Sequence, residues 1–306
     1  MKPQVVVIGS ANTDLVIRVR QLPHWGETVT GGRFAIVSGG KGANQAVAAS
    51  RAGASVTLIA NIGRDPFGNA ALNGLRLERI DTRYVTRSPA TPSGVALIMV
   101  GRRGANLMAV AGGSNDELSP KDIDAALPAI RGARCLVLQL EIPLATVRHA
   151  IGLAHRHGVP VLLNPAPARH LPLKLLPHAT WLTPNQRELA TLTGLPTRTK
   201  SEVATAACKL RMRGVEHILV TLGERGVCWC SGAGTRWFAA PKVRAIDTVG
   251  AGDCFSGAFA ATVAEGNSVA DAIRFAIAAS AISVTRPGAQ SSMPTRREIL
   301  RALSNH

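Results

Sequence analysis

The chain has 306 residues, of which 46% are hydrophobic and 18% charged, and its formal net charge is +16. This length and hydrophobic content allow a large buried core and exclude an intrinsically disordered chain. The apolar runs without charge at 254–264 and 275–285 are too short to cross a bilayer. The N-terminus enters a short β-branched run at 5–8 and shows no long apolar leader. We therefore expect a cytoplasmic protein with no membrane partner.

The positive charge comes from 35 Lys and Arg residues against 19 Asp and Glu. Such an excess raises the question of a nucleic-acid partner. The basic residues are scattered, however, and an aromatic content of 4% leaves few side chains on which bases could stack. We interpret the charge as a solvated basic surface and expect no nucleic-acid partner.

Five cysteines are too few for a disulfide scaffold in a chain of this length, and their odd number favours reduced thiols. One residue separates Cys228 from Cys230 on an expected strand, so their side chains lie on the same face of that strand. A metal site would need a second pair of ligands at zinc spacing, and none follows. A buried apolar role is therefore favoured over metal binding.

Short apolar runs alternate with helical segments along most of the chain. The runs typical of strands are 5–8, 56–60, 135–140, 159–163 and 217–221. Helices are expected at 43–52, ended by Gly53, from Pro66 after an Asp65 cap, and from Pro120 after Ser119. This alternation predicts an α/β fold with three layers, α/β/α, in which helices cover both faces of a mainly parallel central sheet.

Two regions interrupt the alternation. Segments 15–19 with 27–37, and 95–100 with 105–110, have the pattern of antiparallel strands, the last two joined as a hairpin across 101–104. They predict a small projecting antiparallel β-sheet, a lid built from about 12–37 and 93–112. Such a lid would cover a site or pack against a second subunit. With no linker in the sequence, we expect one domain over 1–306.

The stretch 247–253 carries the most chemical information. Gly250, Ala251 and Gly252 are small and leave backbone N–H groups accessible where a helix begins, and the helix dipole there favours an anion such as phosphate. Asp253 follows at once, and a carboxylate beside a bound phosphate suits a general base that accepts the proton of an attacking hydroxyl. A purely structural turn into a helix is the alternative for the glycine-rich part.

A second glycine-rich stretch spans 38–45. It lacks the P-loop spacing, so it is weak evidence for nucleotide binding. Lys41 and Asn44 are suited to hold hydroxyl groups of a small polar ligand. Asn12 and Asp14 follow the first strand, where ligands bind in α/β folds, although an Asx-turn would also explain the pair.

The two glycine-rich motifs, at 39–46 and 247–257, occur together with further motifs at 139–141, 164–168, 183–188, 221–226 and 285–290. In combination they resemble the ribokinase-like carbohydrate kinase superfamily, and within it the ribokinases. The resemblance extends from about residue 5 to residue 303, and the number of separate motifs makes it specific.

This resemblance implies ATP-dependent phosphorylation of D-ribose at its 5-hydroxyl to give ribose 5-phosphate, with Asp253 as general base and the amides of Gly250, Ala251 and Gly252 as anion hole. A related deoxyribose, fructose or adenosine kinase remains an alternative. A ligand-binding protein without activity is disfavoured by the intact Asp253. The sugar site implied by the resemblance consists of Asn12, Asp14, Gly39, Gly40, Lys41, Asn44, Glu141 and Asp253.

The resemblance also implies sites for ATP and for cations. The ATP site comprises Asn185, Thr221, Leu222, Gly223, Glu224, Arg225, Gly226, Gly252 and Ile277. Asn185 and Glu188 match the motif that places Mg²⁺, through water. An activating K⁺ would be held by Asp247, Val249, Ser283, Arg286, Gly288 and Ser292, Arg286 through its carbonyl.

Two further expectations follow from the resemblance. The partners are ribose, ATP and a second copy of the chain, in a homodimer formed through the lid. Several relatives place a polar residue near adenine where this chain has Ile277, so we expect an apolar contact to the base and leave base discrimination open.

Overall fold

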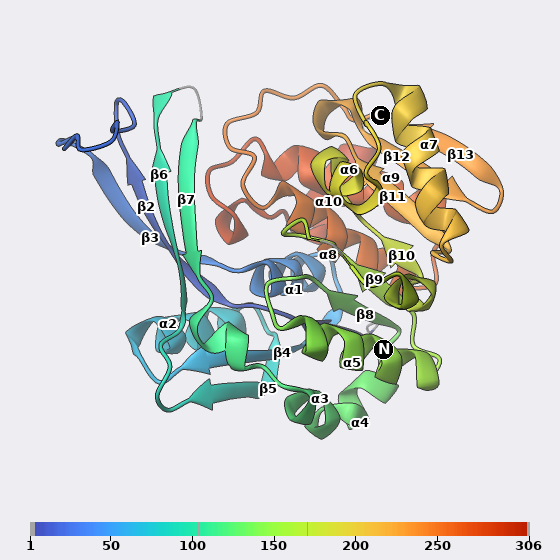
Figure 1. Ribbon diagram of the computed structural model, residues 1–306, viewed down its shortest axis with the longest axis horizontal. Coiled ribbons are helices and arrows are strands. Elements are labelled where there is room, and N and C mark those ends of the chain that lie inside the picture. Colours follow the sequence, from blue (N-terminus) through green and yellow to red (C-terminus); the bar gives the residue numbers. More distant parts are fainter. Residues whose placement is uncertain (1–3, 103–104, 170, 305–306) are drawn as a thin grey trace.

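A nine-stranded sheet runs through the computed structural model, which describes residues 4–102, 105–169 and 171–304 (Figure 1). In spatial order the strands are β13 (Gly234–Phe238), β12 (Val227–Ser231), β11 (His217–Thr221), β10 (Trp181–Leu182), β9 (Val161–Leu163), β8 (Cys135–Leu138), β1 (Gln4–Ile8), β4 (Ser55–Gly63) and β5 (Asp81–Ser88). Neighbours from β11 to β5 are parallel, whereas β12 pairs antiparallel with β11 and β13. The mainly parallel sheet is confirmed, although β5, β10 and β13 were not among the expected strands.

Helices cover both faces of this sheet. On one face lie α1 (Lys41–Arg51), α2 (Pro66–Leu77), α8 (Ala251–Ala264), α9 (Val269–Ser283) and α10 (Arg296–Ser304). On the other lie α3 (Pro120–Ala125), α4 (Leu127–Arg131), α5 (Leu144–Arg156), α6 (Gln186–Thr193) and α7 (Lys200–Met212). Alternate residues of β1 supply the two cores, Val5 and Val7 on the first face, Val6 and Ile8 on the second. The three-layer arrangement is thus confirmed. None of the described helices is long and apolar enough to span a membrane.

The expected helix starts are present. Asp65 caps α2 by accepting a hydrogen bond of 2.7 Å from the backbone N–H of Gly68 to its Oδ1. Ser119 forms a capping box with Asp122 at the start of α3. Helix α1 begins at Lys41, ahead of the expected start, because Gly40 adopts a positive φ of 85° and serves as its N-cap.

Helices α1 and α8 pack closely, and a glycine makes this possible. A Cβ added at Gly257 would lie 2.5 Å from the carbonyl oxygen of Gln45 and 2.6 Å from Cβ of Ala48. No side chain larger than hydrogen fits at that crossing. The close approach brings the first turn of α1 beside the first turn of α8, and these two turns carry the two glycine-rich motifs.

The lid is a separate four-stranded sheet, which projects from the body on the left of Figure 1. Its order is β3 (Arg33–Gly39), β2 (Asn12–Arg18), β6 (Gly94–Val100) and β7 (Asn106–Ala111). The pairs β2/β3 and β6/β7 are antiparallel, which confirms the expected small sheet, and the central pair β2/β6, for which the sequence pattern made no prediction, is parallel. The reason is topological: β2 follows β1 and β6 follows β5, and β1 and β5 run in the same direction within the main sheet.

The bounds of the lid strands also differ from the sequence estimate. Residues 27–32 are not in a strand, and β3 extends to Gly39. In the turn expected at 101–104, residues Arg103 and Gly104 lie outside the described part of the chain.

The two faces of the lid differ in character. Register places Phe34, Ile36, Leu97 and Leu107 on one face, where each side chain is more than half exposed. Asp14 alternates with Leu15 in β2 and therefore lies on the opposite face. One face of the lid is thus apolar and exposed, and the other carries a carboxylate.

The cysteine pair is buried. Cys228 and Cys230 of β12 have no exposed surface, and Sγ of Cys230 lies 3.4 Å from Sγ of Cys208 on α7. Burial raises the pKa of the Cys228 thiol to about 12. The described residues contain no group of three metal-ligating side chains. The burial of Cys228 and Cys230 agrees with the expected apolar role.

Candidate active site

Polar side chains gather at the carboxyl-terminal edge of the parallel strands. They follow the ends of successive strands: Ser10 after β1, Gln139 and Glu141 after β8, Asn164 after β9, Thr183 and Asn185 after β10, with Thr221 as the last residue of β11. Ligands of open α/β sheets bind beyond this edge. The N-termini of α1 and α8 and the base of the lid lie at the same edge.

A cavity of about 210 Å³ lies here, and its walls combine residues from several of the expected sites. It is lined among others by Lys41, Asn185, Glu188, Thr221, Gly252 and Asp253. Residues expected to touch sugar, nucleotide and magnesium thus share one cavity. A carboxylate, an ammonium group and a helix N-terminus meet in it.

The glycine-rich loop before α8 is shaped to receive an anion. Gly250 is the N-cap of α8, with a φ of 74° that side-chain-bearing residues rarely adopt. A Cβ added at Gly252 would meet nothing within 4 Å, so the first turn opens onto the cavity. The first N–H groups of a helix have no partner within it and carry its positive partial charge. The loop can therefore bind a phosphoryl group.

Asp253 is held by two amides from α1. It is the third residue of α8 and only 6% exposed. Its Oδ2 accepts a hydrogen bond of 2.9 Å from Nδ2 of Asn44, and its Oδ1 one of 2.9 Å from Nε2 of Gln45. Donors on both oxygens hold the carboxylate in one orientation next to the anion-binding turn. This is the arrangement that a general base requires.

Glu141 closes the sugar side of the site. Its Oε2 accepts hydrogen bonds from the hydroxyl of Ser10, at 2.5 Å, and from the backbone N–H of Lys41, at 3.0 Å. The carboxylate therefore ties the end of β1 to the first turn of α1.

Asn12 and Asp14 lie at the base of the lid and are also fixed. Oδ1 of Asn12 accepts a hydrogen bond of 2.7 Å from Nδ2 of Asn115. Asp14 packs against Gly39, where an added Cβ would collide with its carboxylate. A Cβ at Gly40 would lie 2.6 Å from the backbone nitrogen of Asn12. Both glycines are needed for this close approach.

The charges in the site perturb one another. Burial, reinforced by Glu141 and Asp253, raises the pKa of Asp14 from 3.8 to about 6. Burial alone would lower the pKa of Lys41, but the carboxylates of Asp253, Glu141, Glu188 and Asp14 outweigh it and raise the pKa above its ordinary value. Lys41 is thus a permanent cation in an otherwise acidic site.

The turn expected to bind the nucleotide joins β11 to β12. It contains the single 3-10 turn η4 (Gly223–Arg225) and closes through a hydrogen bond of 2.8 Å from the N–H of Leu222 to the carbonyl of Gly226. Gly223 and Gly226 have positive φ values, and a Cβ at Gly226 would collide with the carbonyl of Phe238. Glu224 and Arg225 are exposed on the turn.

Ile277 is, like Leu222 to Gly226, an expected ATP residue outside the cavity lining, and its expected contact with adenine stays a prediction. It lies in α9, is 7% exposed and belongs to the core between α9 and the sheet, and it does not line the cavity. Sequence reasoning placed it beside adenine by resemblance alone. In this structure its visible role is packing.

Asn185 and Glu188 form a capping box at the start of α6. The N–H of Asn185 donates to Oε2 of Glu188 at 2.8 Å, and the N–H of Glu188 donates to Oδ1 of Asn185 at 2.9 Å. Burial raises the pKa of Glu188. The pair therefore orders α6 while both residues face the cavity. Its expected role with Mg²⁺ remains a prediction.

The six residues expected to hold K⁺ lie in two adjacent loops. Oδ1 of Asp247 accepts a hydrogen bond of 3.0 Å from the N–H of Val249, and its Oδ2 one of 3.1 Å from the N–H of Gly288. Arg286 donates its N–H to the carbonyl of Ser283 at 3.0 Å. Ser292 ends the turn η5 (Gln290–Ser292), which follows Gly288. The structure brings Asp247, Val249 and Gly288 into direct contact and places the other three nearby along the chain.

Several buried polar residues of the site were not assigned a role from the sequence. They are Ser10, Gln45, Asn115, Gln139 and Asn164, all hydrogen-bonded to an expected site residue or to one another. Their position directly after strand ends, or next to Asn44, was the available signal. Because amides at such positions are often simple turn or core residues, the pattern alone does not separate them.

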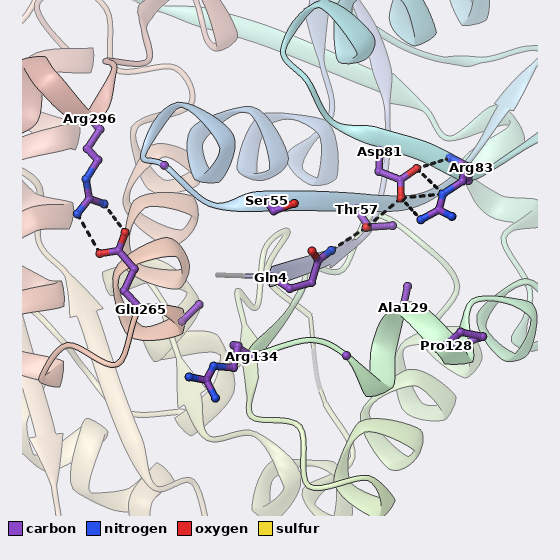
Figure 2. Close-up of a pocket in the computed structure, with 13 residues that line it drawn as sticks. Gln4, Ser55, Thr57, Asp81, Arg83, Pro128, Ala129, Arg134, Glu265 and Arg296 are labelled. Carbon is purple, nitrogen blue, oxygen red and sulfur yellow. Dashed lines mark hydrogen bonds and ion pairs between the residues drawn. The ribbon is translucent and has the colours of Figure 1, made fainter. Parts of the chain in front are cut away.

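A larger groove, of about 1310 Å³, lies at the opposite edge of the sheet (Figure 2). It is bordered by residues where strands begin, such as Gln4, Ser55 and Asp81. Figure 2 shows four of its charged side chains in two pairs, Arg83 with Asp81 and Arg296 with Glu265. Size is therefore a poor guide here, because the smaller cavity holds the reactive groups.

Comparisons with known proteins show the family of this chain. The model of the pfkB family carbohydrate kinases matches residues 2–296. The chain belongs to the pfkB family of carbohydrate kinases. It is 41% identical over 305 residues to a ribokinase of Haemophilus influenzae, with all of both chains covered. It is 40% identical to a deoxyribokinase of Salmonella typhi, with 98% of each chain covered.

Among solved structures, this pfkB-family kinase is similar to the ribokinase of Arabidopsis thaliana complexed with ribose and ATP. The TM-score is 0.91 at 33% identity, with 99% of each chain covered. The shared fold includes the mainly parallel sheet and the small additional sheet. The chain is therefore a carbohydrate kinase by family, and the carboxyl-edge cavity is its candidate active site.

Proposed function

We propose that this kinase transfers the γ-phosphoryl group of ATP to the 5-hydroxyl of D-ribose, giving ribose 5-phosphate and ADP. The observation that carries the proposal is the position of Asp253. Its carboxylate lies between the anion-binding turn of α8 and the amide of Asn44, which belongs to the expected sugar loop. An acceptor for the hydroxyl proton and a cradle for the phosphoryl group are thus adjacent.

The reaction follows from these contacts. Asp253 accepts the proton of the 5-hydroxyl as that oxygen attacks the γ-phosphorus, and the bond to the β,γ-bridging oxygen breaks to release ADP. The N–H groups of Gly250, Ala251 and Gly252 stabilise negative charge on the transferring group. Lys41, held cationic by the surrounding carboxylates, offsets charge from the sugar side. The proton leaves Asp253 when the sugar phosphate departs.

Mg²⁺ is the expected companion of ATP. The buried Glu188 carboxylate and the Asn185 amide face the cavity and offer oxygen donors, which suit a hard cation that keeps part of its hydration shell. Bound with ATP, Mg²⁺ neutralises phosphate charge. The residues present therefore fit the ion, with water between ion and protein.

K⁺ is the second proposed cation. The Asp247 carboxylate, the backbone carbonyls around Val249 and Gly288, and nearby serine hydroxyls form an all-oxygen donor set next to the anion-binding turn. Such a set suits a hard monovalent cation. By bridging the loop before α8 and the loop after α9, K⁺ would order the N–H groups of Gly250 to Gly252.

Ribose is favoured by the polar side chains of the expected sugar site. Carboxylates and amides surround the sugar position, as polyhydroxyl ligands require. Deoxyribose is the second candidate, because a deoxyribokinase is as similar to this chain as the ribokinases are.

The exposed face of the lid supports a homodimer. Phe34, Ile36, Leu97 and Leu107 form an apolar surface on the side away from Asp14. Pairing of two lids through this face would bury it.

A substrate panel tests the proposed activity. Initial rates with ATP are measured for D-ribose, 2-deoxy-D-ribose, D-fructose and adenosine under the same conditions. We expect the highest kcat/KM with ribose. A kcat/KM for deoxyribose equal to or above that for ribose would replace ribose by the second candidate, and preference for adenosine would contradict a free sugar as the acceptor.

A further inference from the structure

Gln45 is a buried amide in contact with the proposed base. It follows Asn44 in the first turns of α1, has no exposed surface, and does not line the cavity. Its Nε2 donates hydrogen bonds of 2.9 Å to Oδ1 of Asp253 and 3.0 Å to Oδ1 of Asn164. Gln45 therefore reaches the carboxylate from the protein interior, on the side that substrate does not occupy.

The orientation of this amide is determined by its neighbours. Asn164 must present its oxygen to Gln45, because its Nδ2 donates to the carbonyl of Thr183 at 2.9 Å. Gln45 must present its nitrogen to Asp253, because an ionised carboxylate only accepts. The oxygen of Gln45 then accepts a hydrogen bond of 2.6 Å from Nε2 of Gln139. The chain Gln139, Gln45, Asp253 has one consistent direction of donation.

Gln139 loses a hydrogen bond in this arrangement. Its Oε1 is buried and has no hydrogen-bond partner among the described residues. Leaving a buried acceptor unpaired is destabilising, and a site-related role is a common reason for such an exception. The Gln139 amide fits here only because residue 9 is a glycine, since a Cβ at Gly9 would collide with the same oxygen. The Gln139 amide thus keeps this orientation although its unpaired oxygen destabilises the fold.

We propose that Gln45 is a positioning residue of the phosphoryl-transfer reaction: anchored by Gln139, it fixes the rotation of the Asp253 carboxylate. The inference rests on the proposed role of Asp253 as base. With Oδ1 held from the interior, the carboxylate cannot turn away from the cavity, and its proton-accepting geometry is set before substrate arrives. Gln45 acts through Asp253 and touches neither sugar nor nucleotide.

The test is substitution of Gln45 by methionine, which has similar length and no N–H donor. We expect kcat of Gln45→Met to fall by about 10- to 100-fold, within the range of a general-base contribution. The dissociation constant for ribose, measured by calorimetry, should stay within about threefold because Gln45 does not line the cavity. The acid limb of the kcat against pH profile should move to higher pH, because the ionised carboxylate loses a donor.

Gln139→Met provides a second variant that leaves the Gln45 to Asp253 bond in place. We expect the same direction of change in kcat with a smaller size, and no gain in stability, because the variant removes one unpaired oxygen but leaves Oε1 of Gln45 without its donor. Gln4→Met is the matched control: it removes one amide donor, the bond of 2.9 Å from Nε2 of Gln4 to Oγ1 of Thr57, at the opposite edge of the sheet (Figure 2). Its kcat profile should equal that of the unmodified protein.

The outcomes separate this inference from the proposed function. If Asp253→Asn abolishes turnover while kcat and the acid limb of Gln45→Met and Gln139→Met are unchanged, the positioning role is overturned and the base assignment stands. A fall in kcat without movement of the acid limb would also overturn it, since a general structural role would do the same. If Asp253→Asn turns over normally, the proposed mechanism itself fails.

Discussion

The amide nitrogen of Asn44 donates a hydrogen bond of 2.9 Å to Oδ2 of Asp253, across 209 residues of sequence. This contact joins the first turn of α1 to the first turn of α8, and so joins the loop expected to hold the sugar to the loop expected to hold phosphate. The two motifs act as one site because α1 and α8 cross closely at Gly257. The predictions below test this site and the parts of the fold that support it.

Asp253→Asn should reduce kcat by about 10²- to 10⁴-fold, because an amide cannot accept the proton of the attacking hydroxyl. Calorimetry should still detect ribose and ATP, since the shape of the site is preserved. Turnover close to that of the unmodified protein would remove Asp253 as the base.

Asp14→Asn should stabilise the protein in a pH-dependent way. The pKa of Asp14 is raised in the folded state from 3.8 to about 6, so the native state binds more protons than the unfolded state between these values. Stability therefore falls as pH rises through this window, and above it the ionised side chain costs up to about 3 kcal/mol. Urea unfolding should show the full gain of the variant near pH 8 and little gain near pH 4.

The same Asp14 variant should lose ribose affinity, because an acceptor for sugar hydroxyls is replaced by an amide. The unmodified protein should show a rise in the KM for ribose as pH falls through about 6, where Asp14 becomes protonated. If Asp14→Asn stabilised the protein equally near pH 4 and near pH 8, the gain could not be assigned to the ionised Asp14 carboxylate.

Potassium should activate the kinase through Asp247. Initial rates should rise when a large organic cation is replaced by K⁺ at constant ionic strength, and Asp247→Ala should remove this response. Asp271→Ala is a suitable control, because Asp271 pairs with Arg274 near the start of α9 and neither residue is among the expected ligands. A flat response of the unmodified protein to K⁺ would reject the cation loop.

Gly257→Ala should destabilise the protein by about 1 to 3 kcal/mol, because the new methyl group forces α8 away from the backbone of α1. It should lower kcat as well, since the displacement separates Asp253 from Asn44. Gly74→Ala is the control within α2: an added Cβ there meets nothing within 4 Å, and alanine should stabilise by about 0.5 to 1 kcal/mol. Denaturant unfolding and steady-state rates check both variants.

Ile36→Lys combined with Leu97→Lys should convert a lid-mediated dimer to a monomer, because two charges would be buried at the interface. Sedimentation velocity measures the change. Leu77→Lys, at another strongly exposed leucine outside the lid, should leave the oligomer intact. A monomer in the unmodified protein at micromolar concentration would contradict the proposed interface.

Much of the site was predictable because its signals are local. The positive φ of Gly250, the start of α8 at Ala251 and the carboxylate of Asp253 depend on residues that are neighbours in sequence. The caps at Asp65 and Ser119 are local in the same sense. Alternation of strands and helices then places the strand ends at one edge, so the general location of the site follows from pattern alone.

The tertiary structure decided how these parts meet. Three features depend on which helices and strands pack together. They are the contact of Gln45 with Asp253 and Gln139, the parallel pairing of β2 with β6, and the place of Ile277 in the core. Glutamine has the same local preferences whether it binds water or a buried carboxylate. Only the packing of α1 against α8 gives its amide a partner 208 residues away, and so turns a polar helix residue into part of the site.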